Sequence, residues 1–518
     1  MSVVHAELSP AEHRQLLYGL QRHDCYDHPV SHMQLVETHI SSVILTGTYA
    51  YKLKKPVDLG FLDFSTLAKR KFCCAEELRL NRRLAPQLYL DVKTIGGSLE
   101  HPVMGGDDPV IDYAIRMREF AQSAQLDRLL KNNGLHSAHI DQLAETIAQF
   151  HQQAARAEHH TDYGDPEQIQ QPVEENFAQI RRIIHEPELL TRLDRPAQWC
   201  QQRFAALTST FIERKQQGYI RECHGDMHLR NMVLLDDTVV LFDCIEFNPQ
   251  LRWIDTISDI AFLVMDLEDR LQAPLARRFL NRYLELSGDY AGVAVLDYYK
   301  VYRAMVRAKV AAIRLAQQDV SESDRQAAMT DLHNYLDLAE RDSRTTTPAL
   351  LLTRGVSGSG KTFYSQQILE QADVIRLRSD VERLRLYPDT APQERYSTAT
   401  SDSVYAHLYA QADLLLQHGQ RVIVDATFLD NDRFAPFVAL AAKHNLPLTI
   451  LEFTAAESVL ARRIAQRHTD ASEATIDIMR QQLQTRQALP ANLQPCTITL
   501  NTEQEINIES LCRQLFKD

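Results

Sequence analysis

The first part of the chain alternates short apolar, β-branched stretches with one amphipathic stretch. Residues 41–51, SSVILTGTYAY, are rich in β-branched and aromatic residues and contain one glycine, which predicts two strands or a bent hairpin. Residues 67–84, LAKRKFCCAEELRLNRRL, have helical composition, and residues 112–120 predict a further strand. The pattern predicts a small β-rich lobe with one helix, over about residues 1–120.

Helical spacing dominates the next part of the chain. Apolar residues recur at helical intervals at Ile140, Leu143, Ile147 and Phe150, and similar segments continue as far as Arg341. One β-like stretch, residues 232–242, interrupts them. A larger helical lobe is therefore expected over about residues 121–340.

A polar stretch without periodicity, RDSRTTTP at residues 341–348, ends in a proline and is the predicted linker. It divides a first domain, residues 1–340, from a second, residues 349–518. In the second domain five apolar stretches, ALLLTR, DVIRL, RVIVD, LTILEF and TITL, alternate with amphipathic helical stretches. This alternation is typical of a parallel sheet flanked by helices. The fold class predicted for the whole chain is α/β and α+β.

Composition and charge narrow the classes of function. A chain of 518 residues with 44% hydrophobic and 24% charged residues is expected to fold as two or three globular domains. Its net charge of −13 disfavours binding to nucleic acid or to an anionic membrane. Eight cysteines without a C-x-x-C pair predict reduced, mostly buried thiols. With neither a signal-peptide pattern nor an apolar run of membrane length, a cytoplasmic location is expected, and the oligomeric state is open.

Residues 355–362, GVSGSGKT, fit the phosphate-binding pattern G-x-x-x-x-G-K-[ST], known as Walker A or the P-loop. An apolar strand precedes them and a helix-like stretch follows, a context that disfavours an ordinary glycine-rich turn. Lys361 is expected to reach the β- and γ-phosphates of ATP, and the Thr362 hydroxyl to bind Mg²⁺. The predicted nucleotide-binding residues are Gly355, Ser357, Gly358, Ser359, Gly360, Lys361 and Thr362.

Two carboxylates and two arginines extend this predicted site. Asp380 follows the strand DVIRL and Asp425 closes RVIVD, and ligands of open α/β sheets lie at the carboxyl ends of strands. Arg463 and Arg467 are spaced i, i+4 on one helical face, where they would neutralise charge on the transferred phosphoryl group. A solvated helix face is the alternative for both arginines.

The segments GVSGSGKT, SDVERLRL, VIVDATFLD and RRIAQR resemble the small P-loop kinases of the gluconate-kinase and zeta-toxin type, over about the last 170 residues. The resemblance implies that Asp380 orients or deprotonates the acceptor hydroxyl, with Arg383 near the acceptor. It also implies that Asp425 holds Mg²⁺ through water and that Arg463 and Arg467 belong to a mobile lid. Phosphoryl transfer, rather than hydrolysis, is the implied chemistry.

A second set of polar residues lies around HGDMHLRN. His224, Asp226 and Asn231 match H-x-D-x-x-x-x-N, and Asp243 follows a short hairpin-like segment. Asp226 is suited to take the proton of the acceptor hydroxyl, whereas Asn231 and Asp243 are suited to bind Mg²⁺ through oxygen atoms. A purely structural loop, or a metal cluster that includes His228, is the alternative.

A lysine and a glutamate upstream match this set. Lys52 lies on an alternating strand and Glu77 on the next helix, the pairing that holds the α- and β-phosphates in protein-kinase-like folds. Lys54 points to the same side of the strand as Lys52, and Glu76 adjoins Glu77, so the sequence leaves both choices open.

Together with AIRMREF at residues 114–120, these residues resemble the aminoglycoside and choline phosphotransferase branch of the protein-kinase-like fold, over about residues 41–259. The match departs from protein kinases in lacking G-x-G-x-x-G, with only Gly47 near that place, and in placing Asp243 in FDCIEF. The two halves resemble a bacterial fusion of such a domain with a P-loop kinase, often labelled an AAA-family ATPase.

The predicted function is an ATP-dependent, bifunctional phosphotransferase that acts on small-molecule hydroxyls with Mg²⁺. A basic stripe in the helical lobe, formed by Lys300, Arg303, Arg307 and Arg314, suits an anionic acceptor, with a salt-bridged face as the alternative. Two other functions stay open. One is a nucleotide-regulated protein with a non-catalytic kinase-like sensor domain. The other is a polynucleotide 5′-hydroxyl kinase, which the acidic charge disfavours.

Overall fold

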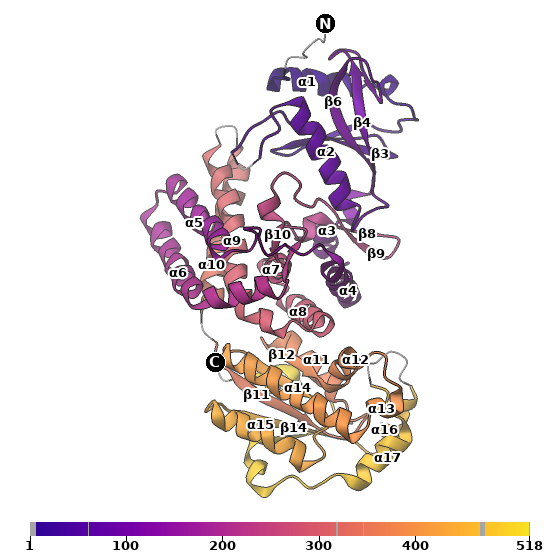
Figure 1. Ribbon diagram of the computed structural model, residues 1–518, viewed down its shortest axis with the longest axis vertical. Helices are drawn as coiled ribbons and strands as arrows, with labels where there is room; N and C mark the ends of the chain where they lie inside the picture. Colours follow the sequence, from indigo (N-terminus) through magenta and orange to yellow (C-terminus); the bar gives the residue numbers. More distant parts are fainter. Residues whose placement is uncertain (1–6, 61, 318–319, 345, 467–471, 517–518) are drawn as a thin grey trace. The chain divides into compact units, whose positions relative to one another are not determined.

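The computed structural model describes residues 7–60, 62–317, 320–344, 346–466 and 472–516. Its elements are drawn in Figure 1. The chain contacts divide it into two compact units. The first comprises Met1–His139, Gln153–Gln168 and Arg214–Asp259, and the second comprises Ile140–Gln152, Ile169–Glu213 and Ile260–Asp518. Most of the helical segments therefore group with the C-terminal sheet.

The first unit is built on a six-stranded antiparallel sheet of order β1-β2-β3-β6-β4-β5. Its strands are β1 (Gln34–Glu37), β2 (Ser41–Leu45), β3 (Tyr49–Lys54), β4 (Tyr89–Gly97), β5 (Pro102–Met104) and β6 (Val110–Arg118). The predicted strands at residues 41–51 and 112–120 are confirmed. The strands β1, β4 and β5 were not predicted from the sequence.

Two helices pack with this sheet. Helix α2 (Leu67–Asn81) begins after an N-cap at Thr66, and its Arg70 Nε donates to Asp112 Oδ1 on β6 at 2.8 Å. The predicted helix at residues 67–84 is thus confirmed. Helix α1 (Pro10–Gly19) was not predicted, although its N-terminus carries a capping box between Ser9 and Glu12, which is a sequence signal for a helix start.

Two pairs of short strands flank the polar loop that follows residue 222. Short strands β7 (Ile220–Glu222) and β10 (Trp253–Asp255) pair, and β8 (Met232–Leu235) pairs with β9 (Thr238–Leu241) as an antiparallel hairpin. This hairpin confirms the predicted β-like stretch at residues 232–242. Val233, Val240 and Phe242 share a hydrophobic cluster with Ile115 and Met117 of β6, so the hairpin is anchored on the six-stranded sheet.

Helices fill the middle of the chain, as the periodicity predicts. They are α3 (Leu126–Lys131), α4 (Ser137–Gln153), α5 (Pro166–Ile183), α6 (Pro187–Gln216), α7 (Thr256–Asp269), α8 (Ala273–Ser287), α9 (Val293–Ala316) and α10 (Glu322–Asp342). Helix α10 includes the first two residues of the predicted linker, and residues 346–348 form neither helix nor strand. The domain bounds at residues 340 and 349 stay a prediction.

The C-terminal part is a five-stranded parallel sheet of order β12-β13-β11-β14-β15 (Figure 1). Its strands are β11 (Ala349–Arg354), β12 (Ile375–Arg378), β13 (Arg421–Asp425), β14 (Leu448–Thr454) and β15 (Thr497–Asn501). Its helices are α11 (Lys361–Gln371), α12 (Ser379–Leu386), α13 (Pro392–Arg395), α14 (Thr398–Gln417), α15 (Asn431–Lys443), α16 (Glu457–Ala465), α17 (Ile476–Thr485) and α18 (Ile508–Leu515). All five predicted strands, and the α/β class, are confirmed.

The core of this sheet comes from its apolar strands. Strand β11 is buried at every position, as expected for a central parallel strand covered on both faces. Leu351, Ile423 and Leu451 pack with Ile368 of α11 and Leu511 of α18. A rigid sheet of this kind fixes the loops at the carboxyl ends of its strands.

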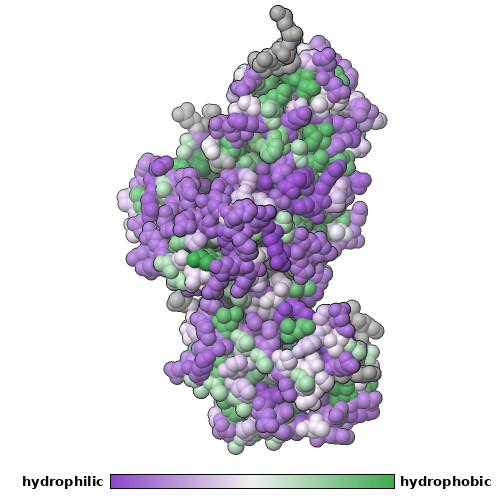
Figure 2. All heavy atoms as spheres, in the orientation of Figure 1, coloured by the Kyte–Doolittle hydropathy of each residue, from purple (hydrophilic) through white to green (hydrophobic). Residues whose placement is uncertain are grey.

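The side of the molecule drawn in Figure 2 is largely hydrophilic, with scattered hydrophobic residues. Within the described ranges, every helix is either too short or too polar to cross a membrane. All eight cysteines are free thiols, and six of them are buried, as predicted.

Candidate active sites

The loop at residues 355–360 joins β11 to α11 and curves tightly. Gly355, Gly358 and Gly360 have φ angles of 147°, 81° and 97°, which L side chains rarely adopt. A Cβ atom on Gly355 would lie only 2.6 Å from the carbonyl oxygen of Phe453. The sequence therefore needs glycine here to form the loop.

This loop fits a phosphate group. It ends at the N-terminus of α11, where backbone N–H groups and the helix dipole favour an anion. The Ser359 hydroxyl is buried and, among the described residues, has no hydrogen-bond partner. A polar atom in such a place is expected to find its partner in a bound ligand.

Three predicted residues meet beside the loop. Lys361 Nζ donates to the carbonyl oxygens of Gly355 at 2.9 Å and Val356 at 3.0 Å. Thr362 Oγ1 donates to Asp425 Oδ2 at 2.9 Å, and Asp425 is buried at the end of β13. A hydroxyl and a carboxylate oxygen at this spacing are a suitable ligand pair for a hard divalent cation.

A cavity of about 600 Å³ opens beside the loop. Its lining includes Lys361, Thr362, Asp380 and Asp425. Burial raises the pKa of Asp380, and although a hydrogen bond from Ser472 and the charge of Lys361 act in the opposite direction, the net shift is upward. A carboxylate with a raised pKa is a better proton acceptor than an ordinary aspartate.

Several arginines line this cavity, among them Arg383 and Arg463. Arg383 donates to the carbonyl oxygen of Arg395 at 2.8 Å and stacks on the Tyr396 ring, with 4.7 Å between the guanidinium carbon and the ring centre. Arg463 donates to Thr502 Oγ1 and to its carbonyl oxygen, both at 2.8 Å. Arg463 lines the cavity, and Arg467 lies outside the described residues.

The second candidate site is the loop between β7 and β8. Asn231 Nδ2 donates to Asp226 Oδ2 at 2.9 Å and to its carbonyl oxygen at 3.0 Å. The N–H groups of His224 and Gly225 donate to the carboxylate of Asp259, each at 2.9 Å. These bonds fix the loop so that Asp226 and Asn231 lie together.

Asp243 and Lys52 join the two parts of this site. Lys52 Nζ lies 2.8 Å from Glu77 Oε1 and donates to Asp243 Oδ1 as well. Burial raises the pKa of Asp243, but the ammonium groups of Lys52 and Lys54 outweigh burial, and the net shift is downward. Asp243 also has a φ of 65°, a strained conformation that is typical of functional sites.

The four residues that the sequence leaves as alternatives have different partners in the structure. Lys54 also pairs with Glu77, but its second partner is Glu246, and it is buried. Glu76 pairs with Arg79 and Arg252. Of the two lysines, Lys52 is the one that donates to Asp243, and Glu77 is its other carboxylate partner.

Asp259 and Glu246 support this site and were not predicted from the sequence. Asp259 accepts a hydrogen bond from the N–H group of His224, which lies 35 positions earlier in the chain. Glu246 accepts one from Lys54, which lies 192 positions earlier. Glu246 follows Asp243 by three residues in FDCIEF, which was the available signal.

The basic stripe on α9 has partners inside the protein. Lys300 Nζ lies 2.9 Å from Glu268 Oε2 and 3.3 Å from Asp342 Oδ1. Arg303 is buried, with its guanidinium carbon 5.0 Å from the centre of the Phe262 ring. Arg307 Nε donates to the Tyr335 hydroxyl at 3.3 Å, and Arg314 pairs with Asp324 at 3.2 Å. These contacts match the salt-bridged alternative in part.

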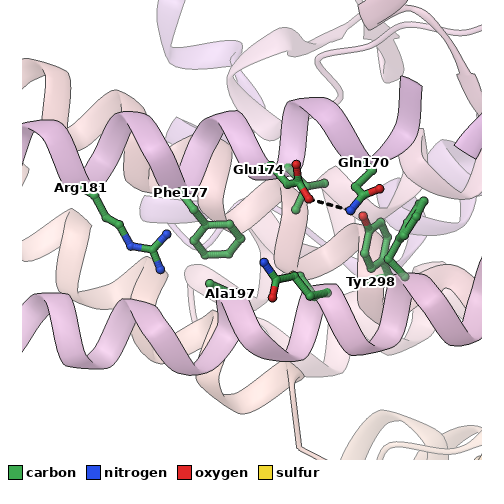
Figure 3. Close-up of a pocket in the computed structure, with 10 residues that line it drawn as sticks. Gln170, Glu174, Phe177, Arg181, Ala197 and Tyr298 are labelled. Carbon is green, nitrogen blue, oxygen red and sulfur yellow. Dashed lines mark hydrogen bonds between the residues drawn. The ribbon is translucent and has the colours of Figure 1, made fainter. Parts of the chain in front are cut away.

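A smaller cavity of about 270 Å³ lies among α5, α6 and α9 (Figure 3). Glu174, Phe177 and Arg181 line it from α5, and Tyr298 from α9. Gln170 Nε2 donates to Glu174 Oε1 at 2.6 Å. None of the predicted site residues lines this cavity.

Comparison with known proteins supports both resemblances. A model of the phosphotransferase enzyme family matches residues 74–296, and an AAA domain model matches residues 350–489. Proteins of Mycobacterium tuberculosis and Mycobacterium bovis, each described as an uncharacterized protein, are 31% identical to the chain over 465 residues. The match covers 88% of this chain and 91% of each relative.

Two solved structures resemble parts of the chain. A choline/ethanolamine kinase family protein from Mesorhizobium loti is 11% identical, with 64% of this chain and 100% of that chain covered and a TM-score of 0.38. A gluconokinase from Sinorhizobium meliloti 1021 is 18% identical, with 33% and 91% covered and a TM-score of 0.25. The chain belongs to the family of the mycobacterial proteins, and it is a phosphotransferase that joins a segment matched by the phosphotransferase enzyme family model to one matched by the AAA domain model.

Proposed function

We propose that both candidate sites are active and that each transfers the γ-phosphoryl group of ATP to a hydroxyl group of a small molecule. The observation that carries this proposal for the P-loop site is the position of Asp380 in the same cavity as Lys361 and Thr362. A proton acceptor beside a phosphate-binding loop favours transfer to an acceptor over simple hydrolysis.

In the P-loop site, the glycine loop and Lys361 hold the phosphates, and Asp380 takes the proton of the acceptor hydroxyl. The acceptor oxygen then forms a bond to the γ-phosphorus while the bond to the β-phosphate oxygen breaks and ADP leaves. Arg467 is proposed to neutralise charge on the transferred group, and Arg463, which donates to Thr502, is proposed to contribute less. Arg383 is proposed to contact the acceptor.

In the kinase-like site, Asp226 is proposed as the base for the acceptor proton. The hydrogen bond from Asn231 Nδ2 orients the carboxylate of Asp226. Lys52, held by Glu77, is proposed to bind the α- and β-phosphates.

Kinases of these classes use ATP with a divalent metal, and we propose that the metal is Mg²⁺. When bound, Mg²⁺ neutralises negative charge on the phosphates. Asn231 and Asp243 would hold it in the kinase-like site, and Thr362 and Asp425 in the P-loop site. Both sets consist of oxygen donors, which Mg²⁺ prefers.

An anionic acceptor is the finer proposal for the kinase-like domain. The basic residues Lys300, Arg303, Arg307 and Arg314 support it by their charge, although all four have internal partners. An unchanged acceptor KM in an Arg303→Gln/Arg307→Gln variant that stays folded would remove this proposal. We also propose a cytoplasmic location, because eight free thiols suit a reducing compartment.

The experiment that tests the function is a screen for ADP release over sugars, aminoglycosides, nucleosides and oligonucleotide ends. Wild type, Asp226→Ala and Lys361→Ala are compared for each acceptor. Two acceptors are expected, one whose signal needs Asp226 and one whose signal needs Lys361. Signals that depend on Lys361 alone would favour a regulated protein with a sensor domain, and an oligonucleotide signal would favour an end kinase.

A further inference from the structure

Helix α8 contacts the edge strand of the parallel sheet through its polar side chains. Both belong to the second compact unit. Asn281 Oδ1 accepts from the N–H of Arg376 at 2.8 Å, and Asn281 Nδ2 donates to the carbonyl oxygen of Val374 at 3.1 Å. β12 is the outermost strand on this side of the sheet, so Asn281 satisfies the backbone groups of an otherwise unpaired edge.

Glu285, one turn further along α8, connects this contact to the P-loop. Arg376 NH2 donates to Glu285 Oε1 at 2.9 Å, and both side chains are almost completely buried, at 1% exposed for Glu285 and 4% for Arg376. Arg376 NH1 in turn donates to Ser365 Oγ on α11 at 3.2 Å. Ser365 Oγ lies 3.2 Å from Asp425 Oδ2, so a continuous chain of polar contacts links Glu285 to Asp425.

A second arginine lies between the same two carboxylates. Arg378 NH1 is 3.8 Å from Glu285 Oε2, and Arg378 Nε is 4.0 Å from Asp425 Oδ2. Arg378 also lines the cavity that contains Lys361 and Thr362. The guanidinium group of Arg378 therefore lies within 4.0 Å of two carboxylates, that of Glu285 on α8 and that of Asp425 in the candidate metal site.

We propose that Glu285 is a positioning residue of the P-loop site: it engages Arg376 and Arg378, limits the pairing of Arg378 with Asp425, and so keeps this carboxylate available to the divalent metal. This inference rests on the proposed function of the P-loop site. Its consequence is that α8, which lies within the segment matched by the phosphotransferase enzyme family model, is part of the working P-loop kinase.

The physical reason is competition between cations for one carboxylate. If Glu285 loses its charge, the two arginines keep theirs, and the Asp425 carboxylate, 4.0 Å from Arg378 Nε, becomes a stronger competitor for Arg378. An arginine at Asp425 repels a divalent cation and occupies its ligand. Partners of metal ligands typically alter metal affinity by 10- to 100-fold, so we expect a rise of about tenfold in the Mg²⁺ concentration for half-saturation.

The test uses the full chain and the non-hydrolysable analogue AMP-PNP. Calorimetric binding is measured over a series of Mg²⁺ concentrations, and the P-loop contribution is the part of the heat that Lys361→Ala removes. Glu285→Gln is compared with Arg278→Gln. Arg278 is the matched control because it lies on the same helix, pairs with Asp141 at 2.6 Å and Glu370 at 2.7 Å, and is separated from Arg376 by two intervening residues, Glu370 and Gln366.

The expected result is a rise of about tenfold in half-saturating Mg²⁺ for Glu285→Gln, against less than about twofold for Arg278→Gln. In the double variant Glu285→Gln/Arg378→Gln, the value should return towards that of wild type, which a purely structural role of Glu285 would not produce. An unchanged value in Glu285→Gln, an equal shift in Arg278→Gln, or no return in the double variant would overturn the inference.

Two further outcomes are distinguishable. If Glu285→Gln does not fold, Glu285→Asp is used instead, because it keeps the negative charge but shortens the side chain by one methylene. An intermediate rise in half-saturating Mg²⁺ is then expected. An unchanged value would overturn the inference. If Lys361→Ala removes no heat from the wild-type signal, the proposed function of the P-loop site fails, and the inference fails with it.

Discussion

The two candidate sites are built in different ways from the same kinds of residues. The P-loop site takes its phosphate cradle from consecutive residues, because a glycine loop and a helix N-terminus supply backbone N–H groups. The kinase-like site consists of side chains from distant segments, with Lys52 and Asp243 separated by 191 positions. One site therefore depends on local backbone geometry and the other on the tertiary fold.

The partners of the two lysines differ as well. Lys361 donates to carbonyl oxygens of its own loop, which are dipoles, whereas Lys52 contacts the carboxylates of Glu77 and Asp243. A phosphate can replace a carbonyl oxygen at little electrostatic cost. In the kinase-like site it must compete with Asp243 for Lys52. Nucleotide binding there is therefore expected to need the metal, which would engage Asp243, more strictly than binding at the P-loop.

The largest effect expected in either site is that of Asp226→Asn. The change removes the proposed base and alters the hydrogen bond from Asn231, so we expect turnover of the kinase-like site to fall by about 10³-fold. ADP release in a Lys361→Ala background measures this site alone. Asp236→Asn, in the turn between β8 and β9, is the matched control. Equal rates in Asp226→Asn and the control would show that the kinase-like site is not catalytic.

Asp380→Asn is expected to lower turnover of the P-loop site by about 10²-fold, because the phosphate clamp remains and only proton transfer is lost. The pKa of Asp380 is raised, mainly by burial. A base must be deprotonated, so activity should fall with decreasing pH at a higher pH than an ordinary aspartate would give. The pH profile in an Asp226→Asn background measures this. Asp389→Asn, a change at an exposed carboxylate, is the control and should keep the fall in activity at low pH. If that fall persists in Asp380→Asn, a group other than Asp380 is responsible for it.

The paired lysines of β3 allow the roles of nucleotide binding and stability to be separated. Lys52→Met is expected to raise the KM for ATP in the kinase-like site by about tenfold or more, because it removes the proposed phosphate contact. Lys54→Met leaves the buried Glu246 without its lysine, and breaking a buried ion pair costs about 3–5 kcal/mol of unfolding free energy.

Thermal unfolding and the KM for ATP are measured for both lysine variants. The larger loss of stability should come from Lys54→Met and the larger change in KM from Lys52→Met. The reverse assignment would place Lys54 at the nucleotide.

The same pair shows where prediction from sequence ends. GVSGSGKT could be assigned residue by residue because its eight positions are contiguous and their flanking strand and helix are visible in the pattern. Lys52 and Lys54 share one side of a strand, and both do contact Glu77, so only the tertiary position of Asp243 and Glu246 distinguishes them.

The contacts of α8 with the parallel sheet had no sequence signal. Glu285 lies 91 positions from Arg376, and nothing in the periodicity of α8 marks it as a partner of the parallel sheet. Strands β11 and β13 of that sheet were predictable because apolar residues dominate each of them and polar residues bound them. Strand β4, by contrast, mixes partly exposed and buried positions and ends in two glycines, which hid it from the pattern.

The smallest effect we expect comes from Arg463→Gln. An arginine that contacts a transferred phosphoryl group directly is worth several powers of ten in rate, but two hydrogen bonds of Arg463 go to Thr502. If the residue mainly holds Thr502 and the loop, its loss should cost about tenfold in turnover, which corresponds to about 1.4 kcal/mol, with little change in the KM for ATP. Arg462→Gln, an exposed neighbour on α16, is the control for a change of charge. A loss of 10³-fold or more would instead mean that Arg463 leaves Thr502 during the reaction and contacts the phosphoryl group.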